Sequence, residues 1–155
     1  MKYLAIFAAV FGLSVCARAQ DASLSDAANR AFLAANAHKA GTVVRGDGLQ
    51  YTVIQAGAGN TPAPTDQVDV VYSGALINGK VFDHSDPGSP ASFRVYELIP
   101  GWTEALTLMR PGAVWQVVIP ADLAYGAKGT PDGAVPPGQT LVFALKLVAI
   151  HRAAD

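Results

Sequence analysis

The sequence has a single cysteine, Cys16, and few charged residues. Because one thiol cannot form an intrachain disulfide, the fold does not depend on disulfides, and no second thiol is present for a thiol metal site or a redox pair. The 155 residues include eleven Lys and Arg against twelve Asp and Glu, scattered without a basic run. This distribution argues against a surface for nucleic acid or lipid headgroups. The length suits one ordinary domain with a sizeable core, plus appendages.

The longest apolar run of the first fifty residues extends from Leu4 to Val15. Lys2 precedes it, and the small-x-small pattern Ala17-Arg18-Ala19 follows it. This order predicts a secretory signal peptide at 1–19 rather than a membrane span. We therefore expect the mature protein to be periplasmic or secreted, with no stable membrane insertion once the signal has been removed. A buried N-terminal helix and a lipid anchor on Cys16 are the alternatives.

The next segment, residues 20–47, is predicted to be a short N-terminal helical arm. From Ser23 to Ala40 it is rich in alanine, with small apolar residues at helical spacing, and Gly41 is a stop signal.

A domain is predicted over residues 48–151, where the sequence changes to short alternating or apolar segments separated by Gly and Pro. Asn78-Gly79 is a strong signal for a two-residue hairpin. One helix is expected between Pro100 and Gly112, with apolar residues at helical spacing. The predicted fold is therefore α+β, an antiparallel sheet of five or six strands with one short helix across one face. The expected strands lie in the segments GLQYTVIQAG, VDVVYSGAL, KVFDHS, SFRV, AVWQVVIP and TLVFALKLVAIH.

The usual catalytic arrangements are missing. His38 and His151 lie near the two ends of the exported chain, and His84 has no metal-ligand spacing around it. No serine has a nucleophile-elbow context, and no glycine run follows a strand in phosphate-loop order. We therefore expect no metal and no cofactor. A hydrolase built on Asp83 and His84 stays open as an alternative, although it would need a further oriented group.

An apolar, aromatic set of residues with one carboxylate in it remains. Asp83 follows Phe82 in an otherwise apolar strand, where a buried carboxylate is costly unless it is hydrogen-bonded. Tyr125 begins a loop of glycine and proline, residues 124–138, that is unusually long for a connection without a helix or strand. An ordinary core with a loose surface loop, or a binding pocket with the loop as its wall, would explain these features.

Four motifs, in order, resemble the FKBP-type peptidyl-prolyl cis/trans isomerases. They are VVYSGALINGKVFDHS, ELIPGWTEAL, IPADLAYG and VPPGQTLVFALKLVAI, and the resemblance extends from about Gly48 to Ile150. The N-terminal helix followed by GLQYTVIQAG resembles the exported bacterial branch, which is related to the macrophage infectivity potentiator proteins.

The resemblance implies a half-barrel sheet wrapped around the helix, with a substrate proline bound between them and the 124–138 loop as a flap. It implies that Asp83 and Tyr125 are the catalytic residues, and we expect the Tyr72 hydroxyl to be the hydrogen-bond partner of Asp83. The backbone N–H of Ile99 is expected to hold a substrate carbonyl. The implied substrate-binding residues are Tyr72, Phe82, Phe93, Leu98, Ile99, Trp102, Val135 and Phe143.

The implied activity is acceleration of rotation about X–Pro bonds in proline-containing polypeptides that fold outside the cytoplasm. The resemblance also implies that tacrolimus or rapamycin can bind, and we expect a monomer. A non-catalytic binding module or chaperone that keeps the fold and captures apolar segments is the alternative. Such a module would be expected to lose Asp83, Trp102, Tyr125 and Phe143, all of which are present.

Overall fold

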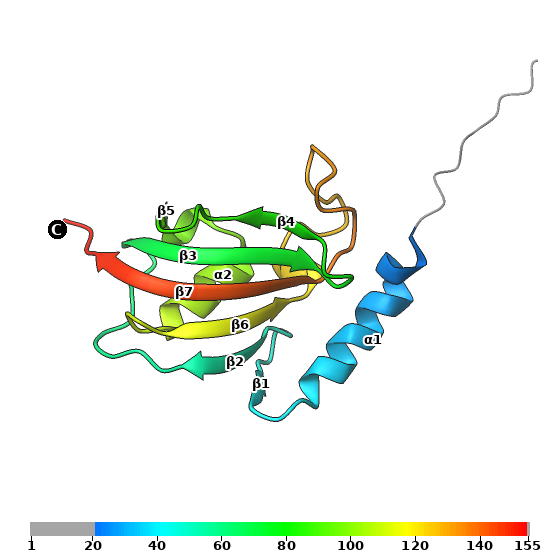
Figure 1. Cartoon of the computed structure of the whole chain (residues 1–155), viewed down its shortest axis with the longest axis horizontal. Coiled ribbons are helices and arrows are strands. Elements are labelled where there is room, and N and C mark those ends of the chain that lie inside the picture. The colour runs from blue at the N-terminus through cyan, green and yellow to red at the C-terminus, as the bar shows by residue number, and fades with distance from the viewer. Residues whose placement is uncertain (1–20, 155) are drawn as a thin grey trace, which may run out of the picture.

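The structure, a computed structural model, describes residues 21–154; the predicted signal peptide, residues 1–19, lies outside the described residues. Figure 1 shows a twisted sheet with helix α2 behind it and helix α1 beside one end. The strands are β1 (Thr42–Val44), β2 (Gln50–Gln55), β3 (Gln67–Leu76), β4 (Val81–His84), β5 (Ala91–Arg94), β6 (Val114–Ile119) and β7 (Leu141–His151). The helices are α1 (Asp26–Ala37) and α2 (Pro100–Leu108), with 3₁₀ turns η1 (Ala22–Leu24), η2 (Val95–Glu97) and η3 (Ala121–Leu123).

All strand pairs are antiparallel, and the sheet order is β1-β2-β6-β7-β3-β4. Strand β5 also pairs with β3, along Gln67–Val70, whereas β4 pairs along Ser73–Ala75. Because β7 pairs along the whole length of β3, β4 and β5 share the opposite edge of β3. The α+β antiparallel prediction is confirmed by this topology.

The sheet has seven strands, one more than the five or six predicted. The additional strand, β1, falls inside the segment predicted to be a helical arm, and its Val43 pairs with Tyr51 of β2. A strand of three residues is too short for its alternation to be recognised, and only its pairing with β2 makes it part of the sheet. The sheet therefore begins before residue 48, where the domain was expected to start.

Helix α2 and the sheet enclose the core. Pro100 stands in the first helical turn, where its missing N–H costs nothing. Trp102, Ala105 and Leu106 are buried at helical spacing and face the sheet, as the sequence pattern predicted. The strand β7 supplies the opposing surface, with every second residue from Leu141 to Leu147 buried. Burial of these side chains is the main force that holds the helix on the sheet.

Glycine permits the close approach of α2 to the sheet. A Cβ atom at Gly101 would lie 2.5 Å from the Cγ2 atom of Ile119 on β6, a distance that real contacts do not allow. A larger residue would displace either the isoleucine or the first turn of the helix. The position of Trp102, the next residue, therefore depends on this glycine.

Helix α1 (Asp26–Ala37) lies inside the predicted Ser23–Ala40 but is shorter at both ends. The hydroxyl of Ser25 caps it by accepting a hydrogen bond from the backbone N–H of Ala28, at 3.2 Å. No helix in residues 21–154 is long and apolar enough to cross a membrane.

The C-terminal segment is anchored on Asp66, which is 3 % exposed. Its carboxylate accepts hydrogen bonds from the backbone N–H of Ala63 (2.8 Å) and of Ala153 (3.0 Å), and from the Arg152 guanidinium (2.6 Å). These donors, led by the two backbone groups, lower the pKa of Asp66 below its ordinary value of 3.8. The residue ties the loop before β3 to the end of β7.

We predict that Asp66→Asn lowers stability at neutral pH and flattens the acid dependence of unfolding. A carboxyl whose pKa is lowered by folding stabilises the folded state fully above its ordinary pKa of 3.8. That stabilisation is lost as the pH falls through the lower folded value, and asparagine has no such transition. Urea unfolding of both proteins between pH 2 and pH 7 measures the effect. Asp122→Asn, at an exposed carboxyl, is the control, and an equal change in both variants would contradict the prediction.

Candidate active site

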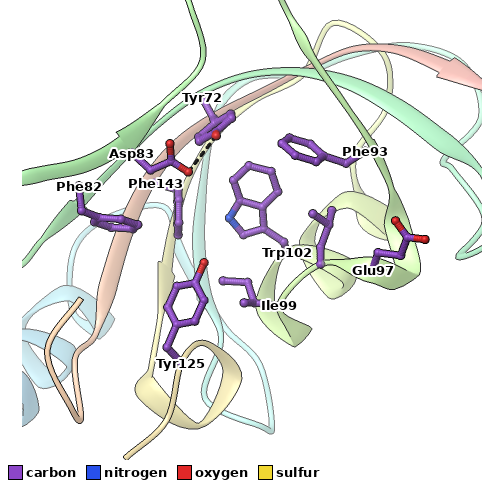
Figure 2. A pocket seen from close by; sticks show the side chains of 10 residues that line it. Tyr72, Phe82, Asp83, Phe93, Glu97, Ile99, Trp102, Tyr125 and Phe143 are labelled. Atoms are coloured by element: carbon purple, nitrogen blue, oxygen red, sulfur yellow. Dashed lines mark hydrogen bonds between the residues drawn. The ribbon is translucent and has the colours of Figure 1, made fainter. Parts of the chain in front are cut away.

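A cavity of about 260 Å³ opens between the sheet and the start of α2. Figure 2 shows aromatic side chains grouped around the Trp102 indole, with Asp83 on one side and Glu97 on another. The side chains come from β3, β4, β5, β7, α2, the turn before α2 and the flap, so distant parts of the chain converge here. The lining residues are Tyr72, Phe82, Asp83, Phe93, Glu97, Leu98, Ile99, Trp102, Tyr125 and Phe143.

Trp102 forms the floor of the cavity and is 4 % exposed. Three rings stand almost perpendicular to the indole: Tyr72 (4.9 Å between centroids, 84°), Phe143 (5.1 Å, 83°) and Phe93 (5.9 Å, 88°). Edge-to-face pairs in this distance range are the favoured geometry of aromatic rings. The walls are therefore rigid and apolar, and they leave a hollow above the indole.

The indole nitrogen of Trp102 is buried and has no conventional hydrogen-bond acceptor among residues 21–154. Figure 2 shows this nitrogen facing the ring of Phe143. Phe143 thus walls the cavity beside the buried nitrogen.

The wall behind Phe143 requires a glycine on β3. A Cβ atom at Gly74 would lie 2.4 Å from Cε1 of Phe143 and 2.9 Å from Cζ of Phe82. These two rings are themselves perpendicular, at 82° with centroids 5.7 Å apart. A side chain at this position would push one of the rings toward the cavity.

The polar side of the cavity is a tyrosine–carboxylate pair. The Tyr72 hydroxyl donates a hydrogen bond to Oδ2 of Asp83 at 2.9 Å, which confirms the expected partner. Burial and this hydrogen bond raise the pKa of Tyr72 to about 12. Burial, followed by the charge of Asp83, also raises the pKa of Tyr125. Both phenols therefore remain protonated donors at neutral pH.

The residues before α2 complete the rim. The Ile99 carbonyl accepts hydrogen bonds from the backbone N–H groups of Trp102 (3.0 Å) and Thr103 (3.2 Å). Its own N–H donates to no acceptor within the described part of the chain, which leaves a backbone donor beside the cavity. Glu97 also lines the cavity, and sequence reasoning missed it. Its only signal was its position next to Leu98, on the same 3₁₀ turn.

Nine of the ten residues that the sequence nominated line the cavity. The exception is Val135, which was expected to reach the cavity from the flap. It is 1 % exposed and belongs to the main hydrophobic core, and it is not among the residues that line the cavity. An apolar side chain in a polar loop indicated burial, but the pattern could not show which apolar region buries it.

The proposed hydrolase pair is not assembled. Asp83 lines the cavity, whereas its neighbour His84 does not, because successive side chains of a strand point to opposite faces. The Nδ1 atom of His84 instead lies 2.9 Å from the Ser85 carbonyl oxygen. Within residues 21–154, no three His, Cys, Asp or Glu side chains gather as metal ligands would.

Comparison with known sequences identifies the family. The sequence pattern of the family described as FKBP-type peptidyl-prolyl cis-trans isomerase matches residues 59–148, more than half of the chain. The chain belongs to the FKBP family. The matched region of this FKBP chain contains every residue that lines the cavity.

Individual relatives agree with the family match. The outer membrane protein MIP of Legionella longbeachae is 50 % identical over 125 residues, which are 80 % of this chain and 53 % of that protein. The peptidyl-prolyl cis-trans isomerase Mip of Coxiella burnetii is 47 % identical over 125 residues, 80 % of this chain and 54 % of that protein. The FKBP chain thus spans about half the length of these curated relatives.

Solved structures share the fold. The crystal structure of FkpA from Escherichia coli has a TM-score of 0.79 and 41 % identity, over 83 % of this chain and 60 % of that one. A peptidyl-prolyl cis-trans isomerase from Pseudomonas syringae has a TM-score of 0.76 and 40 % identity, over 81 % of this chain and 92 % of that one. The FKBP fold is therefore established for most of the chain.

Proposed function

We propose that this protein is a peptidyl-prolyl cis/trans isomerase that binds the X–Pro bond over Trp102. The observation that carries the proposal is the mainly apolar, aromatic hollow above the indole, with the Tyr125 hydroxyl and the Ile99 N–H as donors at its edge. Its volume of about 260 Å³ is just below the roughly 300–1,000 Å³ of sites for drug-sized ligands. That size suits one proline ring with its flanking amides.

An apolar cavity suits rotation about an X–Pro amide bond. Rotation about an amide must overcome a barrier of about 18–20 kcal/mol, because resonance is lost in the twisted state. No bond is broken, so neither a nucleophile nor a proton transfer is required. The twisted amide is less polar than the planar one, so an apolar cavity binds it more favourably than it binds the ground state.

The rim donors supply orientation. In this proposal the Tyr125 hydroxyl and the Ile99 N–H each hold one carbonyl that flanks the proline, since neither donates within the described residues. The Asp83–Tyr72 pair presents the polar wall beside the amide. When the carbonyls on both sides are held, rotation about the X–Pro bond is the motion that stays free in the bound peptide.

The proposed substrates are proline-containing polypeptides that fold outside the cytoplasm. Two features support this location: the signal-like pattern of residues 1–19, and the name of the Legionella longbeachae relative as an outer membrane protein. The proposed cavity holds a single ring with its neighbours and contacts no extended sequence, which suits many clients.

The direct test is a peptide assay in which a protease cleaves only the trans X–Pro isomer. Unaided, the cis fraction relaxes in tens to hundreds of seconds, and we expect the purified protein to shorten this time. Tacrolimus, whose pipecolyl ring resembles proline, should inhibit competitively. A folded protein without acceleration would contradict the proposed activity. An active protein that shows no calorimetric binding of tacrolimus would contradict the assignment of the cavity.

We predict that Tyr125→Phe retains much of the activity, whereas Asp83→Leu loses more. The tyrosine variant loses one hydrogen bond, about 0.5–1.5 kcal/mol net, so the rate falls by about tenfold at most. The aspartate variant loses the hydrogen bond from the partly exposed Tyr72 hydroxyl, also about 0.5–1.5 kcal/mol net, and in addition the carboxylate of the polar wall, so its loss should be larger. Rates in the protease-coupled assay, compared with the exposed control Asp86→Leu, measure both effects.

The pH dependence of the rate, measured for the wild type, for these variants and for His84→Ala, tests the mechanism. The ordinary pKa of a phenol is 10.0 and that of both tyrosines is raised further, so neither ionises between pH 6 and pH 8, and we expect an almost constant rate. A rate that changes near pH 6.5, and stops doing so in His84→Ala, would instead require a titrating histidine. That result would refute the proposed mechanism.

We further predict that the exported protein begins at or near Gln20, because the Ala17-Arg18-Ala19 pattern is a typical cleavage site. Mass spectrometry of the protein recovered from the periplasm or medium measures its N-terminus directly. A lipid attached to Cys16 would show that the protein is anchored instead.

A further inference from the structure

Buried amide side chains seat helix α1 on the rest of the domain. Six polar residues in the described chain are almost fully buried, and all but Asp66 lie between α1 and the domain. The five are Asn29, Asn36, Gln50, Gln139 and Thr140. Buried amides are costly unless each one finds its partner, so such an interface tolerates one docking geometry and resists sliding.

The first half of the helix binds the segment that joins the flap to β7. The Oδ1 atom of Asn29 accepts a hydrogen bond from the backbone N–H of Thr140 at 2.8 Å. Its Nδ2 atom donates to Oε1 of Gln139 at 3.2 Å. Gln139 in turn donates to the carbonyl of Leu24, just before α1, at 3.0 Å. The amides thus close a ring between the helix and the end of the flap.

The second half of the helix binds a different part of the domain. Nδ2 of Asn36 donates to Oε1 of Gln50 at 2.8 Å, and Gln50 donates to the carbonyl of Leu33 at 3.0 Å. Gln50 belongs to β2, where it pairs with Val118 of β6, and its side chain makes no hydrogen bond to the flap. The helix therefore has two amide anchors of similar burial, only one of which contacts the flap.

The flap anchor is directly linked to the cavity. The N–H of Gly138 donates to the carbonyl of Gly126 at 2.9 Å, so the two ends of the flap are joined at its base. Gly126 follows Tyr125, which lines the cavity. Figure 1 shows α1 and the flap at the same end of the molecule. An unbroken series of contacts thus connects Asn29 with Tyr125.

We infer that Asn29 and Gln139 are positioning residues for the isomerase site, through which α1 fixes the base of the flap and hence the direction of Tyr125. The flap has internal hydrogen bonds, such as that from the Gly129 N–H to the Tyr125 carbonyl, but it is rich in glycine, whose backbone is the least restricted, so restraint at its base adds to them. This inference rests on the proposed function. By this inference α1 helps to position Tyr125, whereas the sequence suggested only an arm that leads into the domain.

The test compares Asn29→Ala with Asn36→Ala in the full chain, because both remove one buried amide from the same helix. We expect Asn29→Ala to lower kcat/KM by about three- to tenfold, the size of one net hydrogen bond. It should also speed hydrogen exchange of the Gly138 amide, measured by NMR. Asn36→Ala, which loses the single hydrogen bond to Gln50, should lose less stability and change neither quantity. Equal effects of the two variants on kcat/KM and on exchange would overturn the inference.

Further measurements keep the outcomes separate. An inactive wild-type protein would refute the proposed function, while exchange at Gly138 would still decide whether α1 holds the flap. If Asn29→Ala does not fold, Gln139→Leu removes the same contact at similar volume and should show the same pattern. Hydrogen exchange can also be measured in the wild-type protein alone. If the backbone amides of α1 exchange faster than the Thr140 amide, the helix does not hold the flap base. If they exchange more slowly, the inference is supported.

Discussion

The close packing of α2 on the sheet is the constraint on which the site depends. Gly101 lets the first turn of the helix approach Ile119 of β6 more closely than any residue with a Cβ atom could. The following residue, Trp102, is thereby placed deep enough to become a floor rather than a surface side chain. The backbone of Ile99, one turn earlier, is presented at the rim by the same packing.

The site works through its surroundings rather than through a reactive group. Perpendicular rings surround the indole, which forms the floor of the cavity. The polar groups at the rim are phenols kept protonated by their raised pKa and a carboxylate bonded to one of them. Such an arrangement can bind and orient an amide, and it requires no titration at neutral pH.

The N-terminal helix α1 contributes hydrogen bonds at the base of the long flap. A flap of glycine and proline has few buried side chains of its own, with Val135 as its anchor in the core. The amide contacts of α1 restrain the other end of the flap, next to β7. Since amides must match both donors and acceptors, they specify one docking geometry where apolar contacts would accept several.

Much of this protein could be read from local sequence patterns. The strand alternation, the hairpin between β3 and β4 and the Pro100 helix start follow from short-range periodicity and backbone preferences, and each lies where it was predicted. The hairpin loop itself has three residues, 77–79, rather than the two predicted, because Leu76 pairs with Lys80 and only Gly79 has a positive φ. Four ordered motifs nominated the cavity residues because the aromatic side chains and Asp83 stand at characteristic spacings.

Tertiary structure alone decided the rest. Whether Val135 enters the core or the cavity depends on the path of the flap. The three residues of β1 become a strand only by pairing with β2. The role of Asn29 arises only because folding brings Thr140, more than a hundred residues away, to its side chain. These features depend on contacts between distant segments, and local patterns contain no information about such contacts.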